Sequence, residues 1–100
     1  MVKHIVTFKL KEFESPALKA ATLLEFKVAL EGLTSKIDVL KSMEVGINAN
    51  PSESFDFVLV SEFEKMEDVD VYAKHPDHLA VAKNIKLHLE SRGCVDYFVN

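Results

Sequence analysis

Four segments of this chain alternate apolar and polar residues, and two amphipathic stretches separate them. A period of two is typical of β-strands, whereas apolar residues spaced three and four apart are typical of helices. This pattern predicts strands over residues 2–10, 43–47, 55–63 and 94–99. It predicts helical stretches over residues 15–33 and 66–89.

Local signals fix where several of these elements begin and end. Ser15 can accept hydrogen bonds from free backbone N–H groups at a helix start. Pro16 is suited to the first helical position, because a backbone N–H there would have no partner inside the helix. The turn residues 48–52 predict an antiparallel hairpin of the second and third strands. Pro76 interrupts the second helical stretch, because proline disfavours helical geometry in the residue before it. The β-α-β-β-α-β order predicts an α+β, ferredoxin-like arrangement, a four-stranded antiparallel sheet with the helices on one face.

Composition limits the chain to one globular domain over residues 1–100. It is 48% hydrophobic and 28% charged, which excludes disorder, and its net charge of −4 argues against a nucleic-acid partner. The single cysteine, Cys94, cannot form an intrachain disulfide and is expected to be a small buried hydrophobe. We see no signal peptide and no apolar run of about 20 residues, so we expect a cytoplasmic protein without a membrane partner.

Neither face of the predicted sheet is cleanly polar. The third strand places its phenylalanines on one face but keeps Val58 and Val60 on the other, and the first strand keeps Ile5 on its lesser face. A sheet with one face in water normally carries polar residues there. Each aliphatic side chain contributes about 1.5–3 kcal/mol when fully buried. We therefore expect a homodimer that forms through the sheets.

The densest chemistry lies in the sequence Tyr-Ala-Lys-His-Pro-Asp-His, which begins at Tyr72. Tyr72 and His75 are three residues apart and share a helix face, while His75 and His78 flank the proline. His75 is also suited to cap the helix that follows it. The proline between the histidines breaks the spacing that a helical metal site needs, so we predict no metal ion. His4 projects from the apolar face of the first strand, as a satisfied core residue or as a polar group in a cavity.

Aromatic residues near His4 are candidates for the walls of such a cavity. Small-molecule sites are mostly apolar and contain a few convergent polar groups. The candidate pocket residues are Phe8, Phe26, Phe57, Phe63 and His75. Plain core packing is the alternative for each phenylalanine.

These segments together resemble the stress-responsive A/B barrel domain family, Dabb. The resemblance rests on residues 2–9, 43–46, 61–63, 72–78 and 95–97. It covers nearly the whole chain, and the Tyr-x-x-His-Pro-x-His stretch and the opening Lys-His strand are its most specific parts. The resemblance implies a ferredoxin-like α+β barrel that pairs into a homodimer through its sheets.

The resemblance leaves the activity open, because most bacterial members have none assigned. One plant branch, similar to olivetolic acid cyclase, closes a linear polyketide by aldol condensation. In that branch the residue matching His78 acts as the base, the one matching Tyr72 assists at the carbonyl oxygen, and the one matching His4 lines the cavity. Here Phe57 stands where we expect the cyclase to have a histidine. Some plant relatives hold magnesium through backbone carbonyls, in the segment that matches residues 34–40.

Three interpretations remain open at this point. The chain binds a small apolar carbonyl compound without turning it over, or it is a cofactor-free enzyme, either a cyclase or lyase or a monooxygenase. As an enzyme, His78 would take a proton next to a carbonyl, Tyr72 would hydrogen-bond the oxyanion, and His4 would orient the ligand. No cofactor is expected. In the third interpretation the dimer is purely structural, and the chain's own side chains fill the pocket.

Overall fold

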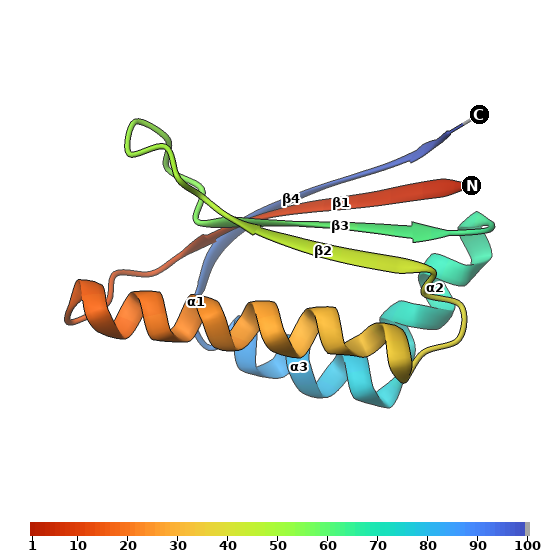
Figure 1. Cartoon of the computed structure of the whole chain (residues 1–100), viewed down its shortest axis with the longest axis horizontal. Coiled ribbons are helices and arrows are strands. Elements are labelled where there is room, and N and C mark those ends of the chain that lie inside the picture. Colours follow the sequence, from red (N-terminus) through yellow and green to blue (C-terminus); the bar gives the residue numbers. More distant parts are fainter. Residues whose placement is uncertain (100) are drawn as a thin grey trace.

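The computed structural model describes residues 1–99, in which four strands and three α-helices follow the order β-α-β-β-α-α-β (Figure 1). The strands are β1 (Val2–Leu10), β2 (Ser42–Ile47), β3 (Phe57–Phe63) and β4 (Leu89–Phe98). The helices are α1 (Pro16–Glu31), α2 (Met66–Lys74) and α3 (Pro76–Lys86), and a short 3-10 helix, Gly32–Ser35, follows α1. Asn100, the last residue of the predicted domain, lies outside the described residues.

The strands form one antiparallel sheet in the order β2-β3-β1-β4, and the helices lie on one side of it (Figure 1). β1 is central, and its Val6 faces Leu59 of β3 on one side and Cys94 of β4 on the other. The predicted α+β, ferredoxin-like fold is confirmed. No helix within residues 1–99 combines the length and the apolar character needed to cross a membrane.

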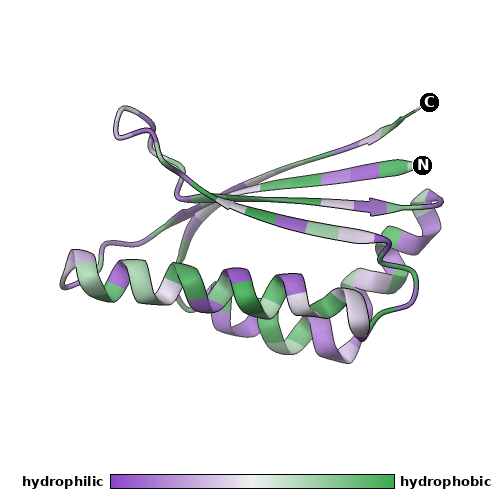
Figure 2. Cartoon of the chain, viewed as in Figure 1, coloured by the Kyte–Doolittle hydropathy of each residue, from purple (hydrophilic) through white to green (hydrophobic). Residues whose placement is uncertain are grey.

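The hydrophobic core fills the space between the sheet and the helices. Alternate residues of β1 and β3 are buried, and α1 buries Leu23, Phe26 and Leu30 on one stripe. Figure 2 shows the corresponding mixture of apolar and polar residues along α1 and the strands. The largest fully buried side chains are Tyr72, Phe26, Phe63, Leu30, Leu33 and Ile37. Because Tyr72 belongs to this set, the candidate chemistry lies inside the core.

The predicted caps are present at both helix starts. The Ser15 hydroxyl accepts the Leu18 N–H at 3.1 Å, and α1 begins at Pro16. His75 caps α3 in the same way, since its Nδ1 accepts the Asp77 N–H at 3.1 Å. Each cap satisfies a backbone donor that has no partner inside the helix.

The last helix is shorter and the last strand longer than predicted. We expected helix as far as Leu89 and strand from Cys94, but α3 ends at Lys86 and β4 begins at Leu89. Residues 89–93 pair with the end of β1, for example Ser91 with Lys9. The hydrogen bonds of this strand pair outweigh the helical pattern of the segment. The third strand also starts later than predicted, at Phe57 rather than at Phe55.

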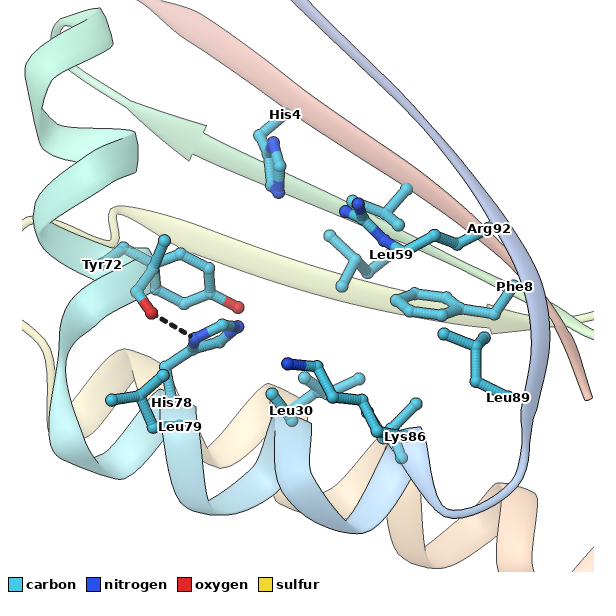
Figure 3. A pocket seen from close by; sticks show the side chains of 14 residues that line it. His4, Phe8, Leu30, Leu59, Tyr72, His78, Leu79, Lys86, Leu89 and Arg92 are labelled. Carbon is cyan, nitrogen blue, oxygen red and sulfur yellow. Dashed lines mark hydrogen bonds between the residues drawn. The ribbon is translucent and has the colours of Figure 1, made fainter.

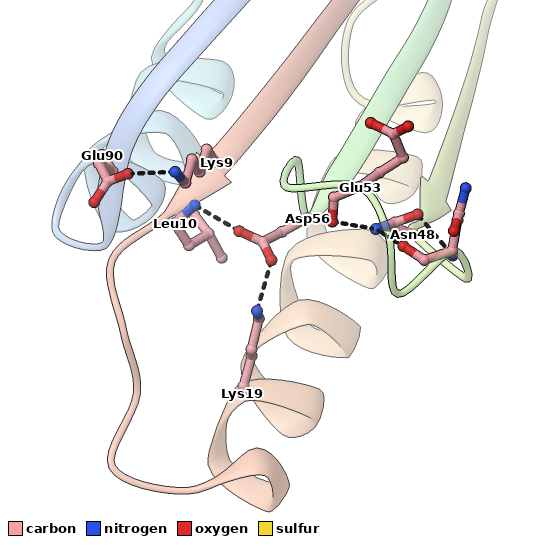
Figure 4. A network of polar contacts seen from close by, with 8 residues as sticks. Lys9, Leu10, Lys19, Asn48, Glu53, Asp56 and Glu90 are labelled. Carbon is pink, nitrogen blue, oxygen red and sulfur yellow. Dashed lines mark hydrogen bonds and ion pairs between the residues drawn. The ribbon is translucent and has the colours of Figure 1, made fainter.

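Asp56 fastens the loop before β3 to the end of β1 and to α1 (Figure 4). One carboxylate oxygen accepts the Leu10 N–H at 2.7 Å, and the other lies 2.6 Å from Lys19 Nζ. The Asp56 side chain is only 11% exposed. Across the same end of the molecule, Lys9 and Glu90 form an ion pair at 3.0 Å between two side chains that are far more exposed.

We expect Asp56→Ala to lower the free energy of unfolding by about 1–3 kcal/mol, because it leaves a partly buried N–H and a lysine without their acceptor. Glu90→Ala is the control, since it removes an exposed ion pair and should cost less than about 1 kcal/mol. Urea unfolding of both variants measures the difference. Equal losses in the two variants would contradict this role of Asp56.

Candidate functional site

A cavity of about 280 Å³ lies between α3 and the face of the sheet that the helices cover (Figure 3). This volume is close to the lower limit of about 300 Å³ for small-molecule sites. Its walls are mostly apolar and come from the strands, α1, α2 and α3, including Phe8, Leu30, Leu59, Leu79 and Leu89. The polar groups that reach it are His4, Tyr72, His78, Lys86 and Arg92.

Tyr72 brings a hydroxyl group to this cavity from the last turns of α2. Its side chain is 1% exposed, and its ring contacts Phe63 and His78, with centroid separations of 5.4 and 4.4 Å. The hydroxyl is buried and has no hydrogen-bond partner within residues 1–99. A buried hydroxyl without a partner costs about 1–3 kcal/mol. Burial also raises the pKa of Tyr72, so the hydroxyl keeps its proton and remains a donor.

His78 lies in the first turn of α3, beside the Tyr72 ring (Figure 3). Its Nδ1 is 2.9 Å from the Ala73 carbonyl. Because a carbonyl only accepts, Nδ1 carries the proton and Nε2 keeps its lone pair. Burial lowers the pKa of His78, and the positive charges of Lys86 and Arg92 add to this effect. His78 is therefore a neutral imidazole near pH 7, with one nitrogen free to accept a proton.

His4 is held by a carboxylate on the neighbouring strand. It pairs across the sheet with Asp96 of β4, whose Oδ1 hydrogen-bonds to His4 Nδ1. This contact orients the ring and fixes the proton on Nδ1, as carboxylate partners of histidine commonly do. Figure 3 shows the His4 ring pointing into the cavity from β1. His4 is thus a polar residue of the cavity whose hydrogen bond is also satisfied. Both roles that the sequence left open for His4, a satisfied histidine and a polar group in a cavity, are present together.

Cys94 lies next to this pair, and it is exposed rather than buried as predicted. The expectation fails because β4 is an edge strand in which every residue after Leu89 is exposed. The Cys94 Sγ is 3.6 Å from His4 Nδ1 and 3.9 Å from Asp96 Oδ2. These three residues together offer the nitrogen, sulfur and oxygen ligands that zinc accepts. We interpret them as a hydrogen-bonded cluster, because His4 and Asp96 already satisfy each other directly.

The magnesium site that the resemblance implies, at backbone carbonyls of residues 34–40, stays a prediction. In this segment the Ile37 carbonyl accepts the Leu40 N–H at 3.1 Å.

Four of the five predicted pocket-wall residues lie elsewhere. Phe8 lines the cavity, but Phe26, Phe57 and Phe63 belong to the core around it. Phe57 stacks on Phe8 with a centroid separation of 4.4 Å, so it supports the wall from behind. His75 is not a cavity residue, because its ring turns back to cap α3. All three residues predicted to be catalytic, in contrast, reach the same cavity.

Sequence reasoning missed two cavity residues, Lys86 and Arg92. Lys86 is eight residues after His78 on α3, a spacing that returns to the same helix face, and this signal was available. Arg92 was missed because it lies between the predicted end of the helix at Leu89 and the predicted start of the strand at Cys94. In β4 it shares a face with Asp96, four residues further on. His88 is partly buried, and its ring stacks on that of Phe13 with a centroid separation of 5.2 Å.

Comparisons with known proteins agree with this structure. The family model "Stress responsive A/B Barrel Domain" matches residues 2–99. One stress-response A/B barrel domain-containing protein of Arabidopsis thaliana is 32% identical over 83 residues, which are 83% of this chain and 30% of that protein. A second A. thaliana protein of the same description is 27% identical over 97 residues, 97% of this chain and 46% of that protein. This chain thus spans between about a third and a half of the curated relatives that it matches.

Among solved structures, a dimeric protein of unknown function with a ferredoxin-like fold from Bacteroides fragilis is similar over nearly its whole length. The TM-score is 0.92 and the identity 45%, with 98% of this chain and 95% of that chain covered. The family model, the sequence relatives and this structure all point the same way. The chain belongs to the stress-responsive A/B barrel domain family.

Proposed function

We propose that this chain binds a small apolar carbonyl compound in the cavity, with the Tyr72 hydroxyl as the donor to the carbonyl oxygen. The observation that carries this proposal is the buried hydroxyl without a partner at the cavity wall. A ligand oxygen would supply the missing acceptor and recover the cost of about 1–3 kcal/mol. The leucine and phenylalanine side chains of the lining would hold the apolar part of the ligand.

A second candidate function is catalysis without a cofactor, and the arrangement of His78 and Tyr72 favours it. His78 Nε2 would take a proton from the carbon next to the carbonyl, and the C–H electron pair would form an enolate. Tyr72 would hydrogen-bond the developing oxyanion, and His4, held by Asp96, would orient the ligand. The enolate carbon would then take back a proton or attack a second carbonyl of the same ligand. In an attack of that kind, the proton on His78 passes to the new alkoxide, so the reaction needs no oxidant or reductant.

We also propose that two copies pair through the open face of the sheet. Ile5, Val58, Val60 and Val95 lie on this face in three adjacent strands, and Val95 is 62% exposed. An apolar patch of this kind is unusual on a monomer. The relative from B. fragilis, which is 45% identical, is described as dimeric.

Tyr72→Phe should weaken ligand binding and stabilise the fold at the same time. We expect the affinity for 2-octanone, measured by titration calorimetry, to fall about 2–12-fold, because one hydrogen bond of about 0.5–1.5 kcal/mol is lost. The free energy of unfolding should rise by about 1–3 kcal/mol, because an unsatisfied group is removed from the core.

Tyr97→Phe is the matched control for this prediction, because Tyr97 lies on the exposed face of β4. It should leave the affinity for 2-octanone unchanged. Unchanged binding in Tyr72→Phe, or no saturable binding of 2-octanone to the wild-type protein, would count against the proposed ligand.

Enolate formation can be separated from simple binding by following deuterium exchange. For an enzyme, the wild-type protein in D₂O should speed exchange of the protons next to the 2-octanone carbonyl, observed by NMR. His78→Asn should slow this exchange about 10²–10⁴-fold, the usual contribution of a general base, with little change in affinity. If the wild-type protein does not speed the exchange, proton abstraction by His78 is excluded and the chain only binds the ligand.

The dimer can be tested by placing a charge on the open face. Val95→Asp should shift the protein from dimer to monomer in sedimentation at micromolar concentration, because a carboxylate would be buried without a partner. Val28→Asp on α1 makes the same change at a residue of similar exposure, 65%, and should remain dimeric. A wild-type monomer, or a Val95→Asp dimer of unchanged stability, would contradict the proposed interface.

A further inference from the structure

We infer that the ligand of this cavity carries a carboxylate, held by Lys86 and Arg92, in addition to the carbonyl group that faces Tyr72. The inference rests on the proposed function and specifies its ligand class: an oxo-acid whose carbonyl and carboxylate are joined by an apolar chain. Figure 3 shows where these groups lie. Tyr72 and His78 lie at one side of the cavity, the Arg92 side chain extends from β4 toward His4, and the Lys86 side chain extends from α3 toward His78.

The charge of the cavity is opposite to that of the whole molecule. The chain has a net charge of −4, yet the cavity lining includes Lys86 and Arg92 and no aspartate or glutamate. Within residues 1–99 neither cation forms an ion pair with a carboxylate, whereas Lys19 pairs with Asp56 at 2.6 Å and Lys27 with Glu31 at 2.9 Å. The two cations therefore face the cavity without a carboxylate partner.

One candidate carboxylate partner on the same strand is already engaged. Asp96 lies on the same face of β4 as Arg92, but its carboxylate hydrogen-bonds to His4. Arg92 also lies near the Cys94 thiol, a weak acceptor. Two free cations are consequently presented to whatever enters the cavity.

The two cations differ in a way that suits a carboxylate. The guanidinium group of arginine is planar and can donate two parallel hydrogen bonds to one carboxylate, while the lysine ammonium adds a mobile point charge. Their positive field already reaches the interior, since both contribute to the lowered pKa of His78. A bound carboxylate would compensate this field. The apolar walls between the two ends, formed by Leu30 and Leu59 among others, would exclude water from a short hydrocarbon chain.

The experiment compares 7-oxooctanoate with its neutral amide, 7-oxooctanamide, by titration calorimetry. The two compounds share the methyl ketone and the chain and differ only in charge. The wild-type protein should bind the acid about 10-fold or more tightly than the amide, since charge-assisted hydrogen bonds are about twice as strong as neutral ones. Lys86→Gln and Arg92→Gln should each reduce this preference for the acid over the amide several-fold.

Lys83→Gln is the matched control, because Lys83 is an exposed lysine of the same helix outside the cavity lining. It should keep the full preference for the acid. A second measurement needs no variant: raising the salt concentration should weaken the binding of the acid and not that of the amide.

The outcomes separate this inference from the proposed function. If the acid and the amide bind the wild-type protein equally well, with no effect of salt, the carboxylate site is wrong and the carbonyl site stands. The carboxylate site is also wrong if the Lys83→Gln variant loses the preference as fully as the cavity variants do. If neither compound nor 2-octanone binds, both the carboxylate site and the proposed function are overturned.

Discussion

The break between α2 and α3 decides where the chemistry of this protein lies. Pro76 cannot continue α2, and His75 before it is extended, with φ −64° and ψ 135°. The chain therefore turns, and His78 at the start of α3 comes back against the end of α2. Its Nδ1 satisfies the Ala73 carbonyl, one of the last carbonyls of α2, which have no partner inside the helix. The same hydrogen bond leaves the other ring nitrogen of His78 free beside Tyr72.

The candidate site lowers the free energy of unfolding, and the packing of the rest of the core compensates for this loss. A buried hydroxyl without an acceptor opposes folding, and the cavity forgoes packing contacts. The surrounding side chains are well packed: Phe63 and Phe26 are almost fully buried, and Phe57 stacks on Phe8. A local loss of stability in an otherwise well-packed fold is expected at a site that binds or reacts with a ligand. The unsatisfied groups all converge on one cavity, which is why we interpret them as functional.

Much of the fold could be predicted from the sequence, because its signals are local. The period of two in β1 and β3, the cap at Ser15 and the break at Pro76 depend only on neighbouring residues. The start of β4 could not be predicted in this way, because its first residues are held by a partner at the other end of the chain, as Ser91 is by Lys9. The error had a consequence for the site, since Arg92 fell outside both the predicted helix and the predicted strand and did not enter the candidate pocket.

The site shows the same limit at the level of packing. The histidine and tyrosine positions could be named from residue type and spacing, but no sequence pattern decides whether Phe57 lines a cavity or lies behind Phe8.

The central claim is that a ligand supplies the hydrogen-bond acceptor that the Tyr72 hydroxyl lacks. A crystal structure of the protein purified from its own host tests it most directly. We predict a bound molecule with an oxygen within hydrogen-bond distance of Tyr72; a closed interior in which a protein group accepts from that hydroxyl would contradict the account.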